Sequence, residues 1–133
     1  MLAITSKSPY AVRALTELAR MGGAAPVPIG EIARRRDIPV QFLEGLFATL
    51  RRAGILQSQR GVKGGYSFAR EPGDVTVLEV VETLEGALDG DTIGADPLWA
   101  EAIGALREKL GAVTITDVAE REARTAGAQM YYI

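Results

Sequence analysis

The side chains of this sequence that could do chemistry are mostly basic, and they gather in its first half. Residues 1–72 hold eleven Lys and Arg against five Asp and Glu, a net charge of +6. Residues 73–133 hold four against twelve, a net charge of −8, so the total of −2 hides the asymmetry. A basic segment suits a polyanionic partner. The pattern indicates nucleic-acid binding by the first half, with charges scattered on solvated surfaces as the alternative.

Cysteine and histidine are both absent from the 133 residues. These residues therefore supply no disulfide, no Cys/His zinc site and no cysteine nucleophile. The sequence contains no nucleophile elbow and no dinucleotide-binding fingerprint. The glycine-rich run 61–65 is not a P-loop, because it lacks the Gly-Lys-Ser/Thr ending and opens no helix. We expect a protein that is not an enzyme and that holds no metal and no cofactor.

Hydrophobic periodicity in the first half predicts three helices. The first spans 8–21, with Ser8 as its cap and a proline at the first helical position. The second spans 29–36 and the third 40–52, joined by a tight turn at 37–39 that ends in proline. A longer helix followed by two short helices with a tight turn is the helix-turn-helix arrangement.

The segment after the third helix predicts a β-hairpin. Residues 55–60 and 66–69 have strand patterns, and the glycine-rich run 61–65 between them supplies the turn. We call this hairpin the wing. The predicted fold class is mainly α with a small β-hairpin wing, a winged helix-turn-helix over residues 8–70.

The polar face of the third helix has the residue types that read a major groove. Gln41 lies near the helix start and can pair with adenine, and Glu44 can accept from the amino group of cytosine. The candidate phosphate contacts are basic residues, namely Lys7, Arg34, Arg35, Arg36, Arg51 and Arg52. Arg60 and Lys63 flank the tip of the wing, where cations suit a minor groove. For each charge the alternative is a solvated side chain.

The second half predicts three further helices. Residues 74–88 carry a capping box at Thr76 and Glu79, residues 98–110 form an amphipathic helix, and a short last helix runs to about residue 124. We expect residues 1–72 to form the DNA-binding domain and residues 73–133 a dimerisation and effector region. No apolar run is long enough for a membrane span, and no signal peptide is recognisable, so we expect a cytoplasmic protein.

Four segments in order resemble the Rrf2 family of bacterial winged-helix transcriptional regulators. They are Ile4–Lys7 leading to Tyr10–Leu15; Ile29–Ala33 with Ile38–Glu44; Leu50–Leu56 with Arg60-Gly61 and Gly64-Gly65-Tyr66; and Thr76–Glu82 followed by Glu85-Gly86. The likeness runs from residue 1 to about residue 124.

The resemblance implies a homodimer that binds an operator in double-stranded DNA. It implies dimerisation through the helix 98–110, whose apolar stripe is Trp99, Ile103, Leu106 and Leu110. The positions that match the family's DNA contacts are Lys7, Gln41, Phe42, Glu44, Arg51, Arg60, Gly64, Gly65 and Tyr66. Two departures are visible: Phe42 replaces a common tyrosine, and Val62-Lys63 replaces a common Pro-Gly at the wing tip.

The largest departure concerns sensing. Many members of this family bind an iron–sulfur cluster through three cysteines after the fourth helix, and here the loop 89–97 has none. The chain therefore resembles a cluster-free branch, regulated by a small molecule or a partner protein. Asp89, Asp91 and Asp96 could hold a divalent cation, although a solvated loop is the better interpretation. We expect a sequence-specific DNA-binding repressor that acts as a homodimer; the alternative is a winged-helix protein-interaction module that does not bind DNA.

Overall fold

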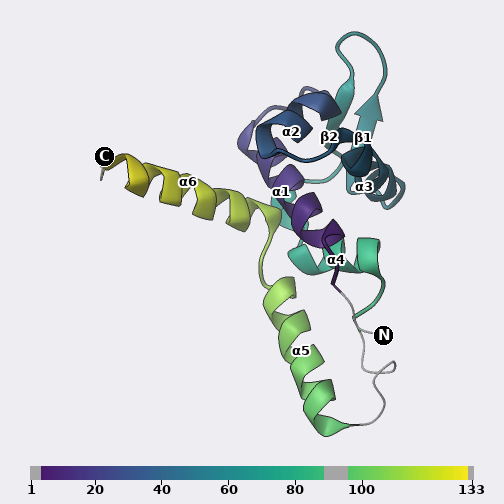
Figure 1. Ribbon diagram of the computed structural model, residues 1–133, viewed down its shortest axis with the longest axis vertical. Helices are drawn as coiled ribbons and strands as arrows, with labels where there is room; N and C mark the ends of the chain where they lie inside the picture. The colour runs from purple at the N-terminus through teal and green to yellow at the C-terminus, as the bar shows by residue number, and fades with distance from the viewer. Residues whose placement is uncertain (1–3, 89–95, 132–133) are drawn as a thin grey trace.

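The computed structural model describes residues 4–88 and 96–131, and the side chains as far as residue 127. Helices dominate, with one two-stranded antiparallel hairpin, as the sequence predicts (Figure 1). The elements in chain order are α1 (Lys7–Arg20), α2 (Ile29–Arg36), α3 (Val40–Arg52), β1 (Leu56–Gln59), β2 (Gly65–Phe68), η1 (Pro72–Asp74), α4 (Val77–Glu85), α5 (Pro97–Gly111) and α6 (Ile115–Tyr131).

The start of α1 differs from the sequence-based expectation. Ser6 is the residue that precedes the helix, and its side chain makes no capping hydrogen bond. Ser8, predicted as the cap, lies inside the helix and is buried, and its hydroxyl donates to Glu85 at 2.9 Å. A local pattern cannot show this, because the hydroxyl's partner comes from α4.

The helix-turn-helix itself has the predicted bounds. Asp37 adopts the left-handed conformation, with φ at 53°, and Ile38 follows with its side chain buried. The Ile38 N–H donates to the Ala33 carbonyl at 2.9 Å, which closes the end of α2. Pro39 precedes α3 and keeps Ile38 out of the helical region. The direction change between α2 and α3 is therefore encoded locally.

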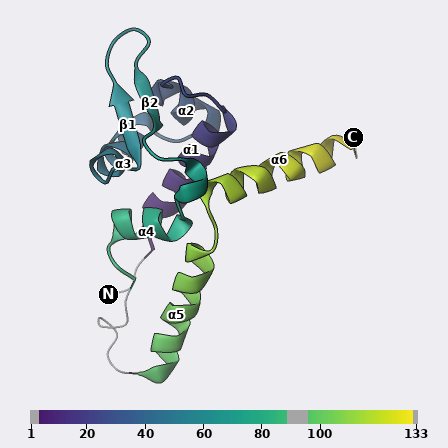
Figure 2. The ribbon, with the colours of Figure 1, turned by 180° about the vertical axis from the view of Figure 1, so that it is seen from behind.

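The wing is a short hairpin anchored at its base. Leu56 pairs with Phe68 and Gln59 with Gly65, so β1 is shorter than the predicted run 55–60, while β2 has the predicted length but begins and ends one residue earlier. Tyr66 also exchanges two backbone hydrogen bonds of 2.8 Å with Val27, in the connector before α2. This bridge fixes the wing to the helical body, while the tip projects away from it (Figures 1 and 2).

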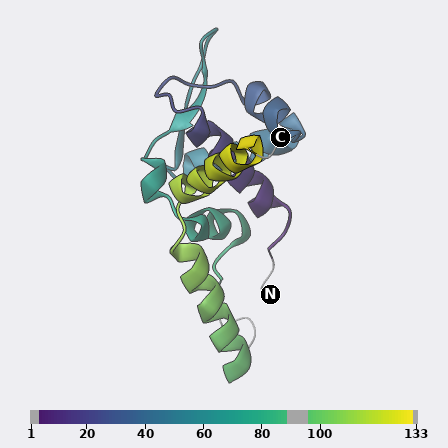
Figure 3. The same cartoon turned by 90° about the vertical axis from the view of Figure 1, so that its left-hand side faces the viewer.

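One hydrophobic core joins both halves of the chain. Its buried members come from α1, α2 and α3, and they pack with Ile55 and Leu56 at the root of the wing. Val75, Val80 and Ile115 belong to the same cluster. The start of the second half is thus packed on the helix-turn-helix, and α6 crosses α1 (Figure 3).

The helices of the second half differ in length from the predictions. The predicted helix 74–88 is too long at both ends, because Asp74 closes the 3-10 turn η1 and α4 runs only from Val77 to Glu85. The Thr76 side chain accepts from the Glu79 N–H at 3.1 Å, as the capping box predicts. The last helix is longer than predicted and reaches Tyr131. It begins with reciprocal 3.0 Å bonds between Thr114 and Asp117, and no proline follows to end it. In the described ranges no helix is long and apolar enough to cross a membrane.

Candidate DNA interface

The third helix presents a polar face beside a buried one. Leu43, Leu46 and Leu50 are buried in the core, whereas Gln41 and Glu44 are exposed in the first half of the helix. A side chain added at Gly45 would meet no atom within 4 Å, so packing inside the chain does not require this glycine. The exposed face is therefore polar at its start and has no side chain at Gly45.

Phe42 attaches the start of α3 to the first turns of α1. Its ring packs edge-on against Tyr10, with 5.5 Å between ring centroids and 80° between planes. Lys7, exposed on the first residue of α1, thus lies at the same end of the helix pair as Gln41. Arg13 places its guanidinium 5.1 Å from the centre of the Tyr10 ring. The sequence analysis did not include Arg13 among the basic residues at this surface. Its position three residues after Tyr10 on the same helix could have indicated the contact between the two side chains.

The far end of α3 is tied to the wing. Arg51 is exposed, and its guanidinium donates to the Ser58 hydroxyl on β1 at 3.3 Å. Figures 1 and 2 show α3 and the hairpin next to each other, at the end of the molecule away from α5. This hydrogen bond joins α3 to the hairpin, the two elements that the sequence predicted to bind DNA.

The wing tip carries exposed cations. Arg60 and Lys63 are exposed, and among the described residues neither makes an ion pair. Val62 between them is fully exposed. These side chains have no role in the packing of the chain, so they are free to contact a partner.

Two glycines at the end of the wing are required by close backbone contacts. A Cβ on Gly64 would lie 2.2 Å from the Gln59 carbonyl oxygen, and one on Gly65 would lie 2.2 Å from the Val27 carbonyl carbon and oxygen. The Tyr66 ring then packs against Phe47, with centroids 5.1 Å apart. All three positions, predicted as DNA contacts, therefore also build the wing.

The arginines at the end of α2 pair with carboxylates of the same chain, and Arg36 does so in a poorly exposed site. The Arg36 Nε donates to Glu17 at 2.8 Å, and its two terminal nitrogens donate to Glu122 on α6 at 2.8 and 2.7 Å. Its side chain is only 15% exposed, and the hydrogen bond to Glu122 raises the Arg36 pKa despite burial. The expectation of a phosphate contact is wrong for Arg36. Arg35 pairs with Glu31 and Glu17 at the surface.

The apolar stripe of α5 is divided between the chain's interior and its surface. Ile103 is buried in its own chain, and Leu106 and Leu110 are half-buried. Trp99 is 51% exposed and Leu98 is 64% exposed. The exposed apolar area thus lies at the start of the helix, and the assignment of the four stripe residues to a dimer interface stays a prediction.

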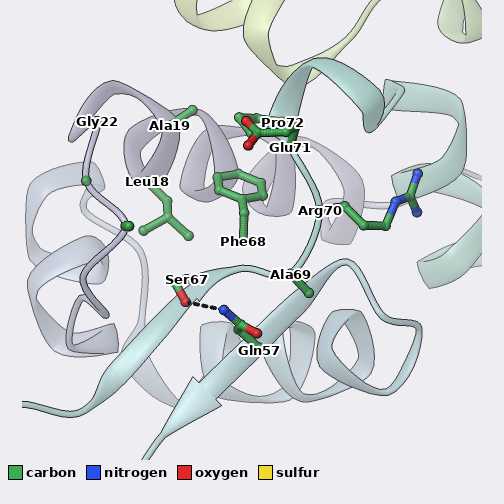
Figure 4. Close-up of a pocket in the computed structure, with 12 residues that line it drawn as sticks. Leu18, Ala19, Gly22, Gln57, Ser67, Phe68, Ala69, Arg70, Glu71 and Pro72 are labelled. Atoms are coloured by element: carbon green, nitrogen blue, oxygen red, sulfur yellow. Dashed lines mark hydrogen bonds between the residues drawn. The ribbon is translucent and has the colours of Figure 1, made fainter.

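A cavity of about 490 Å³ lies at the root of the wing (Figure 4). Leu18 and Phe68 form its apolar wall, and Gln57 donates a 3.2 Å hydrogen bond to the buried Ser67 hydroxyl in its floor. Gly22 and Gly23 at the end of α1 border it. A molecule in this cavity would touch both strands of the wing and the end of α1.

The fold and this surface define a winged helix-turn-helix DNA-binding protein: a polar recognition-helix face beside a hairpin with a cationic tip. A family model, Rrf2, described as an iron-dependent transcriptional regulator, matches residues 4–121. The chain belongs to the Rrf2 family, and like the relatives below it is a transcriptional regulator that binds DNA.

Relatives of known sequence and structure agree with this family. The regulator CymR of Bacillus subtilis is 31% identical, over 98% of this chain and 99% of its own, and its solved structure has a TM-score of 0.82 over 91% of this chain and 98% of that one. The structure of IscR from T. potens has a TM-score of 0.78 at 33% identity, over 91% and 88% of the two chains. A Synechocystis sp. protein, slr0846, is 42% identical over 65% of this chain but only 58% of its own length.

The iron dependence in the family's description does not fit the residues present here. The 133 residues contain no cysteine thiolate and no histidine imidazole to hold an iron–sulfur cluster. Within the described ranges, no three acidic side chains lie close enough to hold a metal ion. Asp89 and Asp91 lie outside the described residues, and Asp96 accepts from the Leu98 N–H at 3.0 Å as the cap of α5.

Proposed function

We propose that this protein is a repressor whose homodimer binds an operator, with the start of α3 in the major groove and the wing tip in the minor groove. The observation that carries the proposal is the exposed pair Gln41 and Glu44 at the start of α3, beside a wing whose exposed cations have no ion-pair partner in the described part of the chain. Base contacts at the start of a recognition helix give specificity, and cations give affinity.

In this proposal, different residues contact the bases and the phosphates. Gln41 pairs with the edge of adenine, and Glu44 accepts from cytosine while its charge disfavours other contacts. Lys7, Arg13 and Arg51 bind phosphates around the groove. The open space at Gly45 lets the backbone of α3 approach the bases. Phe42, Gly64, Gly65 and Tyr66 act mainly by holding α3 and the wing in place.

Selection of bound sequences from random duplex DNA tests this readout. We expect a pseudo-palindromic site whose half-sites lie on one face of the duplex, about one helical turn or a multiple of it apart. Gln41→Ala should relax the preference at one position in each half-site, by about 1–3 kcal/mol of discrimination. An unchanged selected sequence with Gln41→Ala and Glu44→Ala would remove α3 from base reading.

The alternative function is that of a protein-interaction module, and the salt dependence of DNA binding distinguishes it from a DNA-binding regulator. Fluorescence anisotropy with a random duplex should show binding that weakens steeply as salt rises, because each neutralised phosphate releases counterions. A docking module for proteins would show no binding to DNA even at low salt. A promoter fusion in cells distinguishes repression from activation.

The dimer rests on α5. Leu98 and Trp99 keep an apolar surface exposed at its start, and an apolar patch of this kind suits a second copy. Light scattering at micromolar concentration should give twice the mass of one chain, and Trp99→Glu should give a single chain. A wild-type mass of one chain would contradict the dimer.

Regulation in this proposal needs no cluster, no metal and no catalysis. The effector is a small molecule or a protein, and the protein acts in the cytoplasm, where the DNA is. The wing-root cavity is the place where a small molecule would bear directly on the wing (Figure 4). The B. subtilis relative CymR is described as the global cysteine regulator of that bacterium, so sulfur metabolites are the first compounds to test by thermal shift.

A further inference from the structure

The carboxylate of Glu85, the last residue of α4, holds the segment at residues 4–8, here called the arm. One oxygen accepts from the Thr5 N–H at 2.7 Å, and the other from the Thr5 hydroxyl at 2.9 Å. The Ser8 hydroxyl donates to it at 2.9 Å. The donors and the carboxylate are 77 and 80 residues apart in sequence, so this contact exists only in the folded chain.

The same contact orders the first turn of α1. The Thr5 hydroxyl donates to Glu85 and also accepts from the Lys7 N–H at 3.2 Å. Ser6, which precedes the helix, makes no side-chain capping bond, so the arm is fixed from α4 rather than by its own cap. A carboxylate beside a helix start also interacts favourably with the helix dipole.

Glu85 carries a negative charge beside the arm. Burial raises the Glu85 pKa, but the hydrogen bonds from Ser8 and Thr5 outweigh it, so the pKa is below its ordinary value and the group is ionised at neutral pH. In the part of the chain that the structure describes, no Lys or Arg pairs with it. A bare carboxylate beside a DNA-binding arm repels phosphates, which argues that its contacts with the arm offset that cost.

We propose that Glu85 is a positioning residue for DNA binding: it fixes the arm so that Lys7 is held beside the start of α3. The Tyr10–Phe42 contact completes the geometry, because it fastens the first turns of α1 to the first turn of α3. The proposal rests on the proposed phosphate contact of Lys7. It assigns the end of α4, outside the helix-turn-helix, a part in DNA affinity.

A double-mutant cycle on DNA affinity tests the proposal with the full chain. Glu85→Ala should weaken binding about three- to tenfold and make the salt dependence shallower by about one, as loss of one phosphate contact does. In a Lys7→Ala background the same change should not weaken binding further, and loss of the carboxylate's repulsion should leave the affinity unchanged or slightly higher. Glu85→Gln, which keeps one acceptor oxygen, should lie in between.

A charge-matched control separates positioning from general electrostatics. Glu71 is exposed and its side chain makes no ion pair among the described residues, so Glu71→Ala removes the same charge without touching the arm. Glu71→Ala should leave binding unchanged or tighten it. If Glu85→Ala also tightens binding, or weakens it equally with and without Lys7, the proposal is wrong.

A measurement without DNA keeps the two proposals apart. Trypsin should cut after Lys7 faster in Glu85→Ala than in the wild type or in Glu71→Ala, and the product beginning at Ser8 is read by mass. Equal cleavage in the three proteins would overturn the positioning role. A wild type that binds no DNA, with faster cleavage in Glu85→Ala, would overturn the proposed function and the role in DNA binding but leave the arm contact standing.

Discussion

The arginines at the end of α2 and the cations at the wing tip have the same charge and opposite surroundings. Arg36 is 15% exposed and bonds two carboxylates, one of them from α6. Arg60 and Lys63 are exposed, and in the described residues they have no ion pair. In sequence the run 34–36 is the densest basic cluster, yet all three of its side chains pair with carboxylates of the same chain, Arg34 and Arg35 at the surface and Arg36 in a poorly exposed site.

The comparison shows that local charge density is a poor measure of a DNA-binding surface. Acidic residues of the second half form ion pairs with basic residues of the first half: Glu122 pairs with Arg20 and Arg36, and Glu79 pairs with Arg70. These pairs fasten α6 to α1 and α2, and α4 to the segment that follows β2. The cations available to bind phosphates are those without an ion pair to a carboxylate. Among the described residues, Arg60 and Lys63 at the wing tip belong to this set.

The largest effect should come from the glycine that docks the wing. Gly65→Ala places a Cβ 2.2 Å from the Val27 backbone, at a φ of +148°, so the bridge between Tyr66 and Val27 must open. We expect a loss of about 3 kcal/mol or more in the free energy of unfolding, measured in urea, together with loss of DNA binding. Gly30→Ala, which meets no atom within 4 Å, should leave stability unchanged or raise it by up to about 1 kcal/mol.

Removal of the engaged arginine should affect stability and not salt dependence. Arg36→Ala takes from Glu17 and Glu122 the shorter of their ion pairs and leaves them with the longer, more exposed pairs to Arg35 and Arg20, so we expect a loss of about 2 kcal/mol by urea unfolding. Arg34→Ala is the matched control: its side chain is 71% exposed and among the described residues it pairs only with Glu31, so a change within about 0.5 kcal/mol is expected. A shallower salt dependence of DNA binding in Arg36→Ala would contradict the distinction.

Removal of the wing-tip cations should affect DNA and not stability. The double change Arg60→Ala and Lys63→Ala should raise Kd about tenfold or more at low salt and make the salt slope shallower by up to about two. The melting temperature should not change, because neither side chain packs against the chain. Wild-type affinity in this variant would exclude the wing tip from the interface.

The smallest expected effect is on the stability of the protein at acidic pH. The hydrogen bond from Arg36, together with the charges of Arg36 and Arg20, outweighs burial and lowers the Glu122 pKa from its ordinary 4.5. A lowered folded-state pKa gives stability that is present above the unfolded value and is lost as pH falls through the folded value. The stability difference between wild type and Glu122→Gln should thus be constant above about pH 5 and shrink below about pH 4.5. A difference that grows in acid would contradict the ion pair.

Much of the helix-turn-helix was predictable because its signals are local. Pro39 and the turn at Asp37 fix the bounds of α2 and α3, and Thr76 with Glu79 caps α4 as the spacing indicates. Some helix ends were predicted wrongly, and of these the start of α1 has a remote partner that explains the difference. Ser8 is not a cap because Glu85 takes its hydroxyl, and α6 runs past residue 124 to Tyr131.

The sequence by itself determined the helix-turn-helix, the hairpin, the polar face of α3 and the absence of thiol ligands, because each follows from residues a few positions apart or from composition. Only the tertiary structure decided which cations are free and which are paired, and which glycines are required. The pairs Arg36–Glu122 and Thr5–Glu85 join residues 86 and 80 positions apart. Such contacts depend on how the helices pack, and no local pattern contains that information.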